Sequence, residues 1–88
     1  MNSEDREQIR LTIIRRLDER RWGVPTSSIV QMIRWEGFST VTKEDVEIEI
    51  HYLVEKGLVS EVLKSLSPEN KEYRITAEGR DFRATKNL

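Results

Sequence analysis

Three polar side chains spaced four residues apart are the part of this sequence best suited to binding a metal ion. Glu47, His51 and Glu55 fall at i, i+4 and i+8, so on a helix they share one face. Imidazole and carboxylate groups at this spacing can ligate a divalent cation. A single ion would readily take only His51 and one neighbour, however, and structural zinc normally needs four ligands. We therefore interpret the trio as exposed residues on an acidic helix face and predict no metal site.

The sequence contains few of the residue types on which other kinds of catalysis depend. The chain has no cysteine, a single histidine and no glycine-rich loop able to hold a phosphate. Thiolate nucleophiles, cysteine metal sites and nucleotide-phosphate loops are therefore excluded. The sequence predicts a protein that is not an enzyme, that uses no cofactor and that has no evident small-molecule substrate.

The length of 88 residues predicts a single domain, residues 1–88, with one thin core. A chain of this size buries only roughly 60 to 65% of its unfolded surface. We expect about residues 4–84 to be ordered and residues 85–88 to fray. The polar N-terminal segment and the lack of a long apolar run predict neither a signal peptide nor a membrane span. Together with the absence of cysteine, these features favour a cytoplasmic protein.

The net charge is −1 and the pI is near 5.9, so the chain has no overall positive charge with which to neutralise phosphates. The distribution is more informative than the total. Residues 23–57 carry three basic and six acidic side chains, whereas the segments on either side each carry six basic and five acidic ones. The acidic excess therefore falls in the middle of the chain.

Residues 41–59, VTKEDVEIEIHYLVEKGLV, carry a complete set of helix signals followed by a strand. Thr42 is a good N-cap, and Asp45 stands where the reciprocal partner of a capping box belongs. Apolar residues then recur at the spacing of one buried helix face: Val46, Ile50, Leu53 and Val54. Gly57 suits the left-handed conformation that ends a helix. We predict a helix from Thr42 to Lys56 that leads directly into a strand.

A first helix is predicted with Ser3 as its N-cap and its end at Trp22-Gly23-Val24-Pro25, where Gly23 suits the C′ position. Its main apolar stripe is Ile9, Ile13 and Leu17, flanked by Leu11 and Ile14. The arginines toward its end alternate with acidic residues, so we interpret them as a solvated face rather than a basic patch. Val24 is expected to bridge to a later strand.

A second helix is predicted after Pro25, with Thr26 or Ser27 as its cap. Its core residues should be Ile29, Val30 and Ile33. Met32 and Trp35 are placed at the border of the core, although they would alternatively line a small ligand or partner pocket. Gly37 followed by Phe38 predicts a Schellman-type helix end.

Two β-rich segments, residues 58–66 and 72–76, flank the turn-forming cluster Ser67-Pro68-Glu69-Asn70-Lys71 and predict a hairpin. Val62 or Leu63 is expected to pair with Tyr73 and Ile75 and to cover one side of the helical core. Thr76 is the predicted cap of a short final helix, residues 77–84, that docks Phe82.

The segment YLVEKGLV, residues 52–59, resembles winged-helix domains, in which the third helix commonly ends in this way before the chain enters the wing. TSSIVQMIRWEGFSTVTKEDV is similar to their second helix, turn and third-helix start, and YRITAEGRDF to their second wing strand and closing helix. The resemblance covers about residues 9–84, and it extends to compact MarR or PadR regulators and to small winged-helix proteins of Mu-like phages. It implies an α+β winged helix-turn-helix, with a three-helix core, a C-terminal β-hairpin wing and a short final helix.

The resemblance also implies a DNA-associated regulatory or accessory role, in transcription and in a phage setting. The third helix would enter the major groove and the hairpin would touch phosphates. The residues that would carry this role are Ser39, Thr40 and Lys43 near the turn and Lys64, Lys71 and Arg74 on the hairpin. The exposed side of the third helix is acidic, where DNA-binding relatives usually place basic or amide side chains. We therefore expect DNA affinity to be weak.

The alternative is a protein-interaction module built on the same helix. Five of its residues form an acidic surface around one apolar side chain: Glu44, Glu47, Ile48, His51 and Glu55. Such a surface suits a basic protein partner or a second copy of the chain. Fold alone does not choose between these functions. DNA-binding winged helices often dimerise through additional long helices, and a dimer of that kind would here have to use the first or the last helix. Such a dimer and a monomer both stay open.

Overall fold

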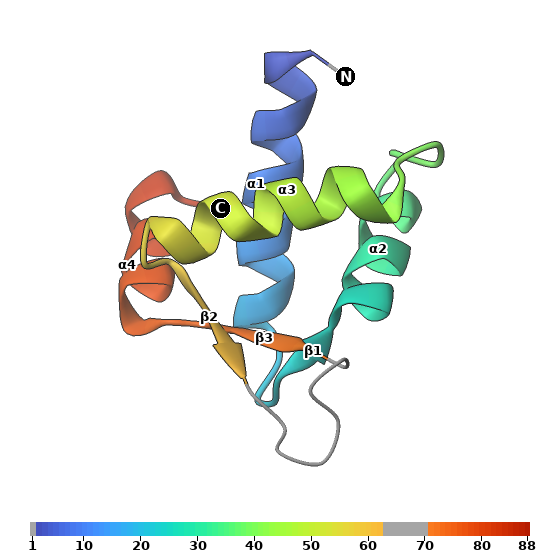
Figure 1. Cartoon of the computed structure of the whole chain (residues 1–88). Coiled ribbons are helices and arrows are strands. Elements are labelled where there is room, and N and C mark those ends of the chain that lie inside the picture. The colour runs from blue at the N-terminus through green and yellow to red at the C-terminus, as the bar shows by residue number, and fades with distance from the viewer. Residues whose placement is uncertain (1, 63–70) are drawn as a thin grey trace.

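The computed structural model describes residues 2–62 and 71–88 and places four helices and three strands in them. In chain order these are α1 (Ser3–Asp18), β1 (Val24–Pro25), α2 (Thr26–Trp35), α3 (Lys43–Glu55), β2 (Val59–Val62), β3 (Glu72–Ile75) and α4 (Ala77–Lys86). This α+β order confirms the predicted succession of helix, short bridge, helix, helix, hairpin and short helix. In Figure 1, α3 crosses in front of α1, with α2 on one side and α4 on the other, and the sheet lies below them. Within the described ranges no helix is long and apolar enough to span a membrane.

The three strands form one antiparallel sheet in the order β1-β3-β2. Val59 lies opposite Ile75, and both side chains are buried. Val62 lies opposite Glu72, so its predicted pairing with Tyr73 or Ile75 is wrong, and Leu63 lies outside the described residues. The physical reason is that a strand turns alternate side chains to opposite faces, and only this register brings both Val59 and Ile75 to the core.

The hydrophobic core lies where α1, α2, α3 and the sheet meet. Its buried side chains are Ile9, Ile13, Ile14, Leu17, Val24, Ile29, Val30, Ile33, Val41, Val46, Ile50, Leu53, Val59 and Ile75. Every residue that the sequence assigned to a main helical stripe is among them, apart from Val54, which packs against the core while half-buried. Thr12 is also buried, and its hydroxyl donates to the Gln8 carbonyl oxygen at 2.8 Å.

Both predicted ends of α1 need correction. Its N-cap is Asn2 rather than Ser3, since the Asn2 side chain accepts the Asp5 N–H at 2.8 Å. The helix ends at Asp18, well before Gly23, and Gly23 does not take a positive φ. The intervening residues are needed to carry the chain from α1 to β1. Gly23 allows the close approach of β3 instead, because a Cβ there would lie 3.0 Å from the Glu72 Cβ atom.

The start of α2 also differs from the prediction. Pro25 is the N-cap, no side chain caps the helix, and Thr26 is the first helical residue. The reason is that β1 pairs with β3 and the helix begins at the next residue, which leaves no separate capping position. At the other end Trp35 is 88% exposed, so its placement at the core border is wrong. It follows Ile33 by two residues, about 200° around the helix and away from the core.

The predicted signals at α3 and at the end of α2 are confirmed. Thr42 and Asp45 form both hydrogen bonds of a capping box, each 3.1 Å long. Gly57 has a φ of 76°, and the Leu58 N–H donates to the Leu53 carbonyl oxygen at 3.0 Å, as in a Schellman ending. The same pattern closes α2, where Gly37 has a φ of 117° and the Phe38 N–H donates to the Ile33 carbonyl oxygen at 3.3 Å.

The last helix begins as predicted and ends later. The Thr76 hydroxyl oxygen accepts the Gly79 N–H at 3.0 Å, which confirms the N-cap. Phe82 is half-buried and packs against the core. The helix runs to Lys86 rather than to Ala84, and Asn87 closes it in the left-handed conformation. Residues 85 and 86, expected to fray, are therefore helical in the structure.

Gly57→Val should destabilise the protein by about 1 to 3 kcal/mol, because a β-branched residue resists a positive φ. The space around this position is open, with nothing within 4 Å of an added Cβ, so the loss would come from the backbone alone. Gly57→Asn is the matched control, since asparagine tolerates the left-handed conformation. Urea unfolding measures both. Equal midpoints for the valine variant and the natural protein would refute the assigned helix end.

Candidate nucleic-acid interface

A groove of about 580 Å³ lies between the outer side of α3, the start of α2 and the hairpin. Its lining residues are Pro25, Thr26, Ser27, Lys43, Glu47, His51, Val54, Glu61, Lys71 and Tyr73. The antiparallel pairing of β1 with β3 brings the α2 start beside the hairpin. Residues far apart in the sequence thus form one polar concave surface.

Each lysine of this groove faces a carboxylate. Lys43 Nζ lies 3.7 Å from Glu47 Oε1, and Lys71 Nζ lies 3.6 Å from Glu61 Oε1. The side chains of all four residues are between 32% and 64% exposed. Exposed ion pairs of this kind contribute little, typically below about 1 kcal/mol, so either lysine can exchange its partner for an incoming anion.

The start of α2 adds neutral donors to the groove. Thr26 and Ser27 line it, and no side-chain hydrogen bond caps the start of that helix. Helix N-termini favour anions because their first N–H groups and the helix dipole both point outward. Beside them, burial raises the pKa of the Tyr73 hydroxyl, and the nearby Glu61 carboxylate raises it further.

The structure brings together some of the predicted DNA-binding residues and separates others. Lys43 and Lys71 share the groove. Ser39 and Thr40 are exposed in the turn that precedes α3. Arg74 is exposed on β3, one position from Tyr73, so the alternation of the strand directs it to the other face of the sheet. Lys64 lies outside the described residues.

The five residues of the predicted interaction surface are all exposed on α3: Glu44, Glu47, Ile48, His51 and Glu55. Ile48 is 54% exposed, and Tyr52 beside it, which the sequence did not single out, is 38% exposed. His51 Nε2 lies 2.9 Å from Glu55 Oε1, while Glu47 pairs with Lys43. In residues 2–62 and 71–88 no group of three histidine, cysteine or acidic side chains is arranged to hold a metal.

A buried glutamate on α3 was missed from the sequence. Glu49 is 1% exposed, and its Oε1 atom accepts a hydrogen bond from the Arg10 Nε atom at 2.7 Å. The Arg10 guanidinium also lies over the Tyr52 ring, 3.8 Å from its centroid. Position 49 is three residues after Val46 and four before Leu53, so the helical spacing could have revealed that it faces α1. This pair fixes the side of α3 that faces α1 and hence the side that faces outward.

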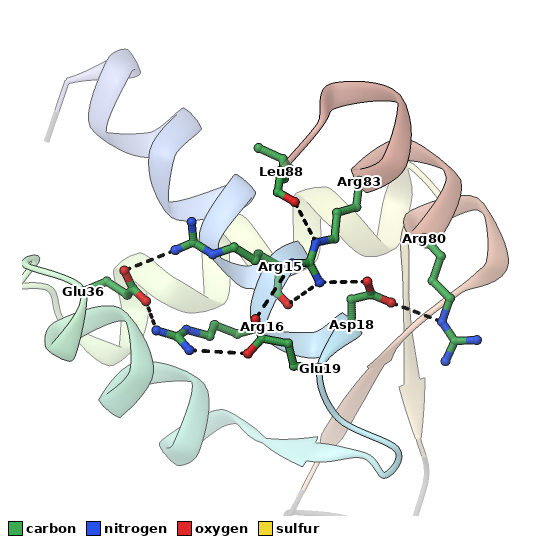
Figure 2. Close-up of polar contacts among 8 residues, drawn as sticks. All are labelled: Arg15, Arg16, Asp18, Glu19, Glu36, Arg80, Arg83 and Leu88. Atoms are coloured by element: carbon green, nitrogen blue, oxygen red, sulfur yellow. Dashed lines mark hydrogen bonds and ion pairs between the residues drawn. The ribbon is translucent and has the colours of Figure 1, made fainter.

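A second ion-pair network joins α1 to α2 (Figure 2). The Arg16 guanidinium donates to the Glu36 carboxylate, and Arg15 Nη2 lies 3.2 Å from Glu36 Oε2. The hydrogen bond from Arg16 holds the pKa of the Glu36 carboxyl below its usual value and raises the pKa of Arg16. These two arginines, interpreted as part of a solvated face, therefore hold two helices together.

The same end of α1 is joined to α4. Arg83 Nη1 donates to Asp18 Oδ2 at 2.8 Å, and Arg80 Nε lies 3.3 Å from the other Asp18 oxygen. Arg83 also donates through Nε to the Leu88 carbonyl oxygen at 3.2 Å. Figure 2 shows Arg83 reaching from α4 to both Asp18 and Leu88. The C-terminal residue is thus tethered to the helical body.

No family model and no curated protein matches this chain. A solved structure does: the PcaV transcriptional regulator from Streptomyces coelicolor, determined in complex with its natural ligand, aligns with a TM-score of 0.70 at 13% sequence identity. The alignment covers 96% of this chain and 51% of the PcaV chain. The fold is a winged helix.

The elements that line the groove correspond to the named parts of a winged-helix fold. α2 and α3 are the helix-turn-helix, and β2 and β3 are the strands of the wing. The winged-helix resemblance predicted from the sequence is therefore confirmed for the fold. The chain spans about half the length of PcaV, and at this identity the likeness establishes the fold alone.

The buried Arg10–Glu49 pair makes a stability prediction. Glu49→Ala should destabilise the protein by about 3 kcal/mol, because it leaves a partly buried guanidinium without its partner. This value is at the low end for buried pairs, since the Arg10 side chain keeps 28% exposure. Lys43→Ala, which breaks an exposed pair on the same helix, should cost less than about 1 kcal/mol.

Urea unfolding of the double variant Arg10→Leu, Glu49→Leu distinguishes the cost of leaving one charge unpaired from the net contribution of the ion pair to stability. Replacing both charges should recover most of the stability lost in Glu49→Ala, as in other buried pairs replaced by apolar residues. If Glu49→Ala and Lys43→Ala proved equally mild, the pair would have no structural role.

Proposed function

We propose that this protein is a small DNA-associated regulatory or accessory protein that contacts duplex DNA with its winged helix. The observation that carries the proposal is the groove in which Lys43, Lys71 and the start of α2 converge. The likeness of its fold to a transcriptional regulator supports the same assignment. A phage setting, suggested by the resemblance to small winged-helix proteins of Mu-like phages, is part of this proposal.

Contact with DNA would proceed by exchange of ion-pair partners. A phosphate entering the groove replaces Glu47 on Lys43 and Glu61 on Lys71, and the first N–H groups of α2 supply further donors. The exposed carboxylates of α3 would then lie close to the phosphates and oppose binding. The expected affinity of the chain alone is therefore in the non-specific range, about 10⁻⁴ to 10⁻⁶ M.

The salt dependence of DNA binding tests this geometry. Lys43→Ala with Lys71→Ala should lower the slope of log K against log salt by about two, because each lysine neutralises one phosphate. Arg74→Ala is the matched control, since Arg74 lies on the other face of the sheet and should leave the slope nearly unchanged. A fluorescence anisotropy titration with duplex DNA at several salt concentrations measures both.

Lys64→Ala, combined with Lys71→Ala and Arg74→Ala, tests the alternative that the hairpin alone carries the affinity. In that case the triple variant should be almost insensitive to salt, whereas binding in the groove leaves the phosphate contact of Lys43 and its share of the salt slope. Tight, sequence-specific binding by the natural chain at physiological salt would contradict the charge argument, and an unchanged slope in the Lys43, Lys71 double variant would exclude the groove.

The acidic surface of α3 supports a second candidate function, binding of a basic protein partner or of a second copy of the chain. Ile48 and Tyr52 are exposed apolar or aromatic side chains beside Glu44, Glu47 and Glu55. An interface of this kind buries an apolar centre and pairs its charged rim with the partner. In this function the carboxylates of α3 favour binding, because they pair with basic groups of the partner, whereas they would repel the phosphates of DNA.

Reversing two charges separates the two functions. Glu44→Lys with Glu47→Lys should weaken and slow partner binding or self-association, while DNA affinity rises only through the added positive charge. Glu78→Lys with Asp81→Lys adds the same charge on exposed positions of α4 and serves as the control. Sedimentation measures self-association and anisotropy measures DNA binding. Loss of an existing sequence preference would show that the glutamates read bases, and the interaction function would be dropped.

A further inference from the structure

Both tryptophans of the chain lie in the solvent. Trp22, in the loop before β1, is 79% exposed, and Trp35, the last residue of α2, is 88% exposed. A tryptophan side chain buries 150 to 250 Å² when it packs, and exposed tryptophans are characteristic of binding surfaces. Neither indole belongs to the core or to the residues packed against it. Their exposure therefore needs an explanation other than folding.

Trp22 borders a second groove, of about 460 Å³, along the outer side of α2. Arg20 lies beside Trp22, Met32 and Pro25 provide apolar surface, and Ser28 and Gln31 provide hydrogen-bonding groups. Trp35 follows Ser28 by seven residues and Gln31 by four, so it continues the same helix face toward the C-terminal end of α2. The two indoles thus stand at opposite ends of one polar-lined face.

Exposed arginines lie at the Trp22 end of this face, where the carboxylate of Glu72 on β3 also approaches, beside Gly23. Residues 20–35 contain three arginines and no acidic residue. Arg20 and Arg21 are exposed, and within the described residues neither forms an ion pair. α3, by contrast, presents Glu44, Glu47 and Glu55 to the solvent. The surface of α2 therefore selects an anionic ligand.

The arrangement of the aromatic rings selects among anionic ligands. Ser28 and Gln31 separate the two indoles, so an acidic peptide would find no continuous apolar strip on which to lay an apolar face. Bases of a flexible strand stack one at a time on separate rings, and their edges can bond to an amide or a hydroxyl. A duplex offers no free base faces to these rings.

We propose that the outer face of α2 binds single-stranded nucleic acid. One base stacks on Trp22 in the groove, with its polar edge toward Gln31 and Ser28, and Arg20 and Arg21 neutralise the adjacent phosphates. A further base stacks on Trp35. The ten residues of α2 extend about 15 Å, so a strand of a few nucleotides spans both rings. Among the residues that the structure describes, this face shares only Pro25 with the groove proposed for duplex DNA. The two sites can therefore be disabled separately.

Titration with oligothymidylate of about twelve nucleotides tests the proposal, a length within the usual site sizes. The two tryptophans are the chain's own fluorescent reporters, so stacking should quench their emission. At equal phosphate concentration, the matching duplex should quench much less, and polyglutamate should not quench. Oligouridylate of the same length should also bind, and the ratio of the two affinities identifies the preferred sugar.

Variants assign the binding to this face, with affinity measured by the anisotropy of labelled oligothymidylate. Trp22→Leu should weaken binding about tenfold, because stacking on one aromatic side chain is worth about 1 to 3 kcal/mol. Arg20→Gln with Arg21→Gln should lower the salt slope by about 1.4, since each phosphate that is no longer neutralised accounts for roughly 0.7. These positions are exposed, so the urea midpoint should stay unchanged and verifies the fold.

Lys43→Ala with Lys71→Ala should leave the single-strand affinity intact, which distinguishes failure of this proposal from failure of the proposed duplex binding. Three results would overturn the inference: an unchanged affinity in Trp22→Leu, equal binding of single strand and duplex, or equally tight binding of polyglutamate. The last result would identify the face as a docking site for an acidic protein segment.

Discussion

The position of α3 relative to the hairpin depends on one backbone joint, at Gly57 and Leu58. Gly57 turns the chain out of α3 with a positive φ, and its carbonyl oxygen accepts the Thr76 hydroxyl at 2.7 Å. The Leu58 carbonyl oxygen accepts the Thr76 N–H at 3.1 Å. Gly79 closes the joint, because a Cβ there would lie 2.2 Å from that same oxygen. The end of α3, both strands of the hairpin and the start of α4 are therefore locked together.

This joint and the Arg10–Glu49 pair together determine which surfaces the protein presents. The joint sets the hairpin beside α3, which creates the groove that holds Lys43 and Lys71. The pair turns the buried side of α3 toward α1, so the remaining carboxylates of α3 face outward. An acidic helix placed beside paired lysines attracts phosphates weakly. The packing of α3 thus places its carboxylates beside the groove lysines. Both functions proposed for the exposed side of α3 depend on this arrangement of charges.

The candidate sites were only partly predictable, and the reason is distance along the chain. Lys43 and Lys71 were identified from the resemblance, but their shared groove depends on the pairing of β1 with β3. Arg74 follows Lys71 closely in sequence, and strand alternation still directs the two to different faces. The exposure of Trp35 follows from its angular position on α2. The sequence prediction relied instead on the general preference of tryptophan for the border of the core, and it was therefore wrong at this position.

Local signals by themselves determined the elements of this protein: the helical apolar stripes, the capping box at Thr42, the two glycine helix ends and the change to a β-rich pattern after Gly57. Each acts within a few residues, so the sequence carries it directly. Only the tertiary structure decided the hairpin register, the end of α1, the pairing of Glu49 with Arg10 and the partners of the other α1 arginines. These depend on residues that packing brings together from distant segments, and a charge or an indole has the same local pattern whether folding buries it, pairs it or leaves it in water.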